Sequence, residues 1–120
     1  MGRRCRRIHF LHAAGYNAPE GSRIGAYVLR FVGGETREFP LVHSQNTHCC
    51  LWSPWRAREL GTNCVPAWHG SNADSEAMNA ELHLYRTTWE NPLPEREITT
   101  IDFVSDLGSA TPFLVAITVE

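Results

Sequence analysis

The chain contains no lysine: its 11 basic residues are all arginines, against 13 acidic residues, for a formal net charge of -2 over 120 residues. This near balance provides no general attraction to nucleic acid or to anionic lipid, so we expect neither as a partner. The N-terminal arginines lead directly into the apolar alternation of Ile8 and Phe10, which favours a solvated strand face over a nucleic-acid-binding arm.

Long apolar runs are also missing. No segment approaches the roughly 18 consecutive apolar residues of a membrane-spanning helix, and the N-terminus lacks the apolar core of a secretory signal. We expect a soluble chain. Its localisation stays open, because a domain taken from a longer protein could have an export signal upstream.

A sustained helical period is absent, and short β-branched and aromatic runs recur between clusters of Gly, Pro, Asn, Asp and Ser. The length suits one domain spanning residues 1–120. Seven or eight antiparallel strands need two packed sheets to bury their apolar faces, which predicts an all-β sandwich of jelly-roll type. The expected strands are 5–13, 24–32, 35–43, 81–89, 97–105 and 112–119.

Three details follow from these runs. Gly33 and Gly34 predict a two-residue hairpin turn, and Pro40, which lacks a backbone donor, predicts that its strand lies at a sheet edge or is bulged there. The alternation in 112–119 predicts a central strand that is covered on both faces. The segment 44–80 has no strand pattern, only two short helical stretches near 55–60 and 74–79, and long irregular segments are often functional.

The chain has four cysteines, whose even number permits disulfides without requiring them: Cys5, Cys49, Cys50 and Cys64. A domain of this size can fold without disulfide bonds, so we expect the four cysteines to be free thiols. His9 and His12 should lie on opposite faces of one strand, with His12 inside, and His83 should be exposed.

Recognised catalytic patterns are missing as well: the chain has no nucleophile elbow, phosphate loop or dinucleotide fingerprint. A trio such as Cys50, His48 and Asp74 can be named in any chain with six histidines. We expect no catalytic residues, and a binding or structural module is favoured over an enzyme.

The stretches RRIHFLHAAGY, IGAYVLRFVGGETREFPLV, LYRTTWENPLPEREITTIDFVS and PFLVAITVE resemble a galactose-binding-like β-sandwich domain of the NPCBM-like type. Such domains occur in bacterial proteins beside glycoside hydrolases. In the middle segment, CCLWSPW and AWHG approximately match a tryptophan pair and a Trp-x-Gly step, whereas His48, Cys49, Cys50 and Cys64 depart from the pattern. The resemblance implies a jelly roll that binds sugars through loops at one end, without a cofactor.

Sugar recognition needs aromatic rings that stack on a pyranose, flanked by side chains that bind hydroxyl groups. The middle segment provides both types, and the candidate ligand-binding residues are Trp52, Trp55, Arg56, Trp68 and Asn72. A structural module, in which these tryptophans only close the sandwich, is the second hypothesis.

The alternative is a metal-dependent jelly-roll enzyme, because imidazoles and thiolates concentrate between residues 43 and 69 and suit copper or zinc. The candidate metal ligands are His43, His48, Cys49, Cys64 and His69. Their spacing matches no standard zinc finger, zinc ribbon or cupin pattern.

Relatives usually have further strands before the position of Arg7, so the domain looks truncated there. We therefore expect an open edge at the strand containing Ile8 to His12, and a twofold homodimer that covers it.

Overall fold

The computed structural model describes all residues except 1, 16–17, 20, 53–59 and 109. Eight strands and one short helix make up the described chain: β1 (Arg7–Gly15), β2 (Arg23–Phe31), β3 (Thr36–Val42), β4 (Leu51–Trp52), β5 (Cys64–Gly70), α1 (Ala73–Ala77), β6 (Glu81–Glu90), β7 (Ile98–Ser105) and β8 (Thr111–Val119). Of the described helices, none is long and apolar enough to cross a membrane.

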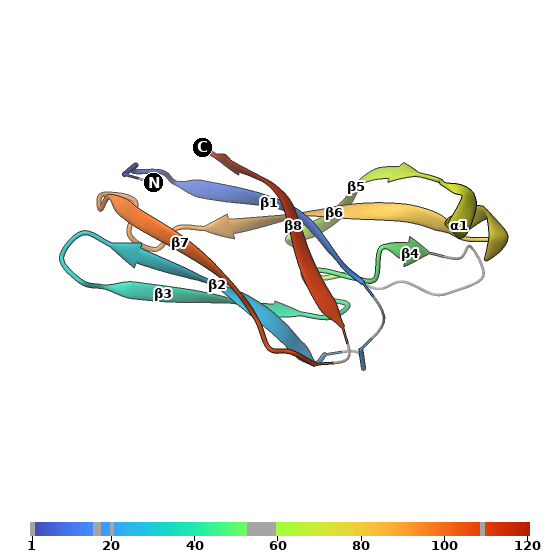
Figure 1. Ribbon diagram of the computed structural model, residues 1–120. Coiled ribbons are helices and arrows are strands. Elements are labelled where there is room, and N and C mark those ends of the chain that lie inside the picture. Colours follow the sequence, from blue (N-terminus) through green and yellow to red (C-terminus); the bar gives the residue numbers. More distant parts are fainter. Residues whose placement is uncertain (1, 16–17, 20, 53–59, 109) are drawn as a thin grey trace.

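The strands form two antiparallel sheets (Figure 1). The larger sheet has five strands in the order β4, β6, β1, β8, with β5 also paired to β6, and the smaller sheet has the order β3, β2, β7. This arrangement confirms the predicted all-β sandwich. The molecule is elongated, 50 × 25 × 24 Å, because the smaller sheet covers only part of the larger one.

Apolar residues at alternate positions of β1 and β2 fill the space between the two sheets. Ile8 and Phe10 of β1 and Tyr27 and Leu29 of β2 are fully buried. The rings of Phe10 and Tyr27 stack with their centroids 3.8 Å apart. Burying side chains of this size stabilises the fold by about 1.5–3 kcal/mol each, so this cluster is its main source of stability.

The predicted glycine hairpin joins β2 to β3, but its turn is longer than two residues. The Gly34 amide donates to the Phe31 carbonyl, which centres the turn on Val32 and Gly33. Gly33 and Gly34 have φ angles of +95° and +92°, which side chains with a Cβ rarely adopt. Pro40 lies in β3, an edge strand, as predicted.

Two predictions about sheet position were wrong. β1, expected at an open edge, lies inside the larger sheet, where it pairs with β6 on one side and β8 on the other. β8, expected to be central, pairs with β1 and is the last strand in the order of the larger sheet, an edge position. Apolar residues on both sides of β8 suggested burial on both faces, yet Val115 is 54% exposed.

The middle segment is more regular than its sequence suggests, because it contains β4 and β5. The helix expected near 74–79 is present as α1, capped by Asn72. The other short helix, expected near 55–60, lies outside the described residues except for Leu60. All four cysteines are described, and no disulfide joins them, as expected.

Candidate functional site

Within the described part of the middle segment, Trp68 is an exposed aromatic residue. It lies on β5 opposite Leu84 of β6, and 51% of it is exposed. Its indole ring lies over Gly70, where a Cβ atom would come within 2.5 Å of the ring. The Trp-x-Gly step therefore has a physical reason: the residue two positions after the tryptophan shares its face of the strand, and glycine leaves room for the ring.

An irregularity in β5 places Val65 on the same face as Trp68. Residues three apart in a regular strand point to opposite faces. The register of β5 against β6 shifts between Pro66 and Trp68, so Val65 lies opposite Arg86 while Trp68 lies opposite Leu84. Arg86 and Leu84 are two residues apart and share a face. The bulge thus places Trp68 on the face that Val65 and Arg86 share.

A shallow groove of about 300 Å³ lies on the same sheet face as Trp68, at the lower end of the size range of small-molecule sites. Its lining residues are mostly polar and come from β5, β6 and the turn before β5: Thr62, Asn63, Val65, Arg86, Thr88 and Glu90. They supply hydrogen-bond donors and acceptors of several kinds.

The groove is partly held in place by its own contacts. The Asn63 side-chain amide donates to the Thr88 carbonyl at 3.3 Å. Glu90 accepts from Arg7 Nε at 2.8 Å. Arg86 is exposed and has no ion-pair partner among the described residues, so its guanidinium is available to a ligand.

The predicted ligand-binding residues do not all meet at this groove. Trp68 lies on the same sheet face but is not among the residues that line the groove. Asn72 caps α1, and its side-chain oxygen accepts from the Ser75 amide at 2.8 Å. The backbone of Trp52 pairs with Glu81 in β4, while Trp55 and Arg56 lie outside the described residues.

Sequence reasoning missed Asn63, Arg86 and Thr88. Their juxtaposition depends on the pairing of β5 with β6, and β5 was not predicted. A signal was available in Val65 to Trp68, a short run of apolar residues that ends on the tryptophan of the Trp-x-Gly step.

A second polar region lies on the inner face of the larger sheet, beyond the apolar cluster. There His12 is almost fully buried and hydrogen-bonded on both nitrogens, as expected for an interior histidine. Its Nε2 lies 2.7 Å from the Asn46 carbonyl and 2.9 Å from Thr87 Oγ1, and its Nδ1 lies 2.7 Å from the Tyr27 hydroxyl.

A carbonyl oxygen can only accept, so Nε2 of His12 has the proton and Nδ1 accepts from the Tyr27 hydroxyl. Burial lowers the pKa of His12 to about 4 and raises that of Tyr27. Both side chains are therefore neutral at physiological pH, and the network stabilises the loop around Asn46 rather than supplying a charge.

His43 and His48 come together on this loop, with ring centroids 4.8 Å apart. Burial, followed by the neighbouring His48, lowers the pKa of His43. Among the other predicted metal ligands, Cys49, which follows His48 in the sequence, is buried, and Cys64 is the first residue of β5. His69 is exposed on β5, opposite His83.

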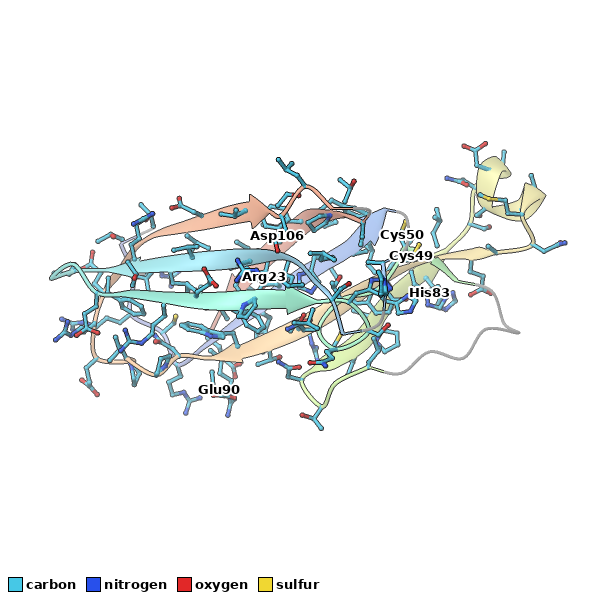
Figure 2. All side chains as sticks on the ribbon, turned by 90° about the horizontal axis from the view of Figure 1, so that it is seen from below. Arg23, Cys49, Cys50, His83, Glu90 and Asp106 are labelled. Atoms are coloured by element: carbon cyan, nitrogen blue, oxygen red, sulfur yellow. The ribbon has the colours of Figure 1, made fainter. Side chains whose placement is uncertain are left out.

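The residues that the structure describes contain no group of three or more His, Cys, Asp or Glu side chains placed to hold one ion. His83 was expected to be exposed, but it is buried, because it points inward beside Tyr85 and hydrogen-bonds to Glu81 at 3.0 Å. Figure 2 shows His83 close to Cys49 and Cys50 at this end of the molecule. Its amide donates to the Cys50 carbonyl at 2.7 Å.

Comparison with known proteins adds no assignment: no family model, no curated protein and no solved structure matches the chain. The resemblance to galactose-binding-like domains is therefore not supported by a match, and the site has to be judged on its own geometry.

Proposed function

We propose that the chain is a non-catalytic carbohydrate-binding module that uses Trp68 as its stacking platform. The observation that supports this best is that a half-exposed indole and a polar groove lie on the same face of the larger sheet. An aromatic ring packs against the apolar face of a pyranose, while neighbouring polar side chains bind its hydroxyl groups.

Each part of the site has a distinct role in this proposal. Trp68 stacks on one sugar ring, and Gly70 keeps the indole flat against the strand. Arg86 and Asn63 then reach the hydroxyl groups of the next ring along the groove, with Thr88 on the same wall. An open groove of this kind suits a chain of sugars better than a single enclosed ring.

The test is a glycan array followed by titration of the best oligosaccharide, monitored by tryptophan fluorescence. We expect Trp68→Ala to weaken binding by about tenfold or more, as for a central aromatic residue, and Arg86→Ala by a smaller factor. Gly70→Ala should also weaken binding, because the new Cβ displaces the ring. Matched controls are Phe103→Ala, which removes a partly exposed aromatic ring from the other sheet, and Arg4→Ala.

Binding that is unchanged in Trp68→Ala would remove this site. A protein that binds no glycan would instead support the second hypothesis, a structural module of a larger bacterial protein.

The alternative proposal, a copper- or zinc-dependent enzyme, has one observation in its favour: the close ring pair of His43 and His48. Elemental analysis of protein purified without an affinity tag tests it. Stoichiometric metal that is lost in His43→Ala would support it, and a metal-free protein of unchanged stability would exclude it.

The homodimer expected from the sequence is likewise a proposal, but the surface expected to form it, the edge of β1, is already paired.

A further inference from the structure

Among the edge strands β3, β5, β7 and β8, β8 is the least protected. Proteins normally protect edge strands with charges, prolines or bulges, because unpaired backbone groups attract other strands. Edge strand β3 contains Arg37, Glu38 and Pro40. Edge strand β7 contains Asp102, which pairs with Arg30 at 3.0 Å. β5 contains Pro66 and a register shift.

No residue from Thr111 to Val119 is charged. Phe113, Val115 and Ile117 are 36%, 54% and 39% exposed. Pro112 and a register shift opposite Leu11 and His12 are the only protective features of this strand among the described residues. Both leave the stretch from Ala116 to Val119 available for pairing.

A groove of about 730 Å³ runs beside this edge, between β8 and β7. Its apolar wall consists of Ile101 on one strand and Ile117 and Val119 on the other. Ile117 lies opposite the buried Phe10 of β1, so it belongs to the inner face of its sheet. It is nevertheless exposed, because β7 does not reach across to cover it. Figure 1 shows β7 and β8 as the strands that border this open side.

We propose that a second copy of the chain covers this edge, with β8 pairing antiparallel to β8 of the other copy around a twofold axis near Ile117. An uncharged strand can pair with a copy of itself in this arrangement without repulsion, because no like charges face each other. Twofold pairing also covers the C-terminal part of β8 in both copies at once, whereas head-to-tail pairing would leave another edge open.

The charges at the two ends of β8 fit the same arrangement. Arg3, Arg4 and Arg6 are exposed near its C-terminal end, where the Arg6 amide donates to the Glu120 carbonyl. Asp106 lies near its N-terminal end, beside Ile24, and pairs with Arg23 at 3.1 Å (Figure 2). Antiparallel pairing brings the arginine end of one copy toward the Asp106 end of the other.

The proposed sugar site lies on β5 and β6, on the opposite side of β1 from β8. Dimerisation would therefore leave both sugar sites open and would present two of them on one particle.

The test is sedimentation or light scattering of the whole chain over a range of concentrations. We expect a species of twice the 13.5 kDa chain mass that dissociates on dilution in the micromolar range, as for a small interface. Val115→Lys should weaken the dimer by about tenfold or more, because it places a charged side chain opposite the apolar Val119 of the other copy.

Val32→Lys is the matched control. Val32 is 53% exposed, as Val115 is 54% exposed, but it lies in the turn between β2 and β3. This variant should dimerise as the unmodified chain does. A monomer at all concentrations, or a dimer that Val115→Lys does not weaken, would overturn the proposal.

Hydrogen exchange gives a readout that needs no variant, should Val115→Lys fail to fold. The amides from Phe113 to Val119 should become protected as concentration rises, while those of β3 should not change. Equal exchange of β8 at low and high concentration would also overturn the proposal.

Discussion

The inner face of the larger sheet has two halves that are stabilised in different ways. Where β2 and β3 lie across from β1, the contacts are apolar, as between Phe10 and Tyr27. Two residues further along β1, the covering element is the loop around Asn46, and His12 replaces an apolar residue. A loop presents backbone carbonyls that must be satisfied, whereas the backbone of a sheet is already paired. The polar half is therefore sensitive to pH and the apolar half is not.

The largest expected effect concerns the apolar half. Phe10→Ala should lower the free energy of unfolding by about 3–5 kcal/mol, because it removes stacking with Tyr27 and leaves a cavity. Urea denaturation measures this. Phe113→Ala, which truncates a partly exposed ring on β8, is the control and should cost about 1 kcal/mol or less. Equal losses in the two variants would show that the core does not lie between the sheets.

The next effect distinguishes the two halves by pH. His12 is neutral in the folded state, with a pKa of about 4 against 6.5 when unfolded. The unfolded chain therefore binds more protons between these values, and stability falls as pH falls through this window. The loss is about 3 kcal/mol in total. His43, whose pKa is also lowered, adds a loss of the same sign.

Urea denaturation at several pH values between about 7 and 4 measures this loss. The slope should become smaller in His12→Gln and stay unchanged in His69→Gln, which alters an exposed histidine of β5. A His12→Gln variant with the full slope would contradict the assignment.

The smallest effect tests the hydrogen bonds of the polar half. Thr87→Val keeps the shape of a fully buried side chain but removes the hydroxyl that donates to the Asn46 carbonyl. We expect a loss of about 1–2 kcal/mol in the free energy of unfolding. Thr36→Val on the exposed edge of β3 should change it by less than about 0.5 kcal/mol. A neutral Thr87→Val would mean that the loop is held by packing alone.

Strands were predictable from the sequence where apolar residues alternate with polar ones, so that one face of the strand is clearly the buried one. Ile8, Phe10 and His12 were correctly assigned to one face of β1, and the glycines of the β2–β3 turn were recognised. The positions of strands within a sheet were not predictable, because an edge strand with apolar residues on both sides, such as β8, resembles a central strand in sequence. The order of β1 and β8 was therefore inverted.

Only part of the candidate site could be predicted for a similar reason. Trp68 was recognised by its residue type and by the following glycine. Arg86 and Asn63 were not, because their juxtaposition in the groove, on the face of Trp68, depends on a bulge and on a cross-strand register. No local pattern encodes that register, since it arises from the packing of the whole sheet.

The most direct test of the account is to map a bound oligosaccharide on the isotope-labelled chain by NMR, using the glycan that binds best on the array. The account predicts shifts of the Trp68 indole N–H and of amides near Val65, Trp68 and Arg86, with β2 and β3 unchanged. Shifts confined to the loop around His43 and His48, or the absence of any glycan that binds, would contradict it.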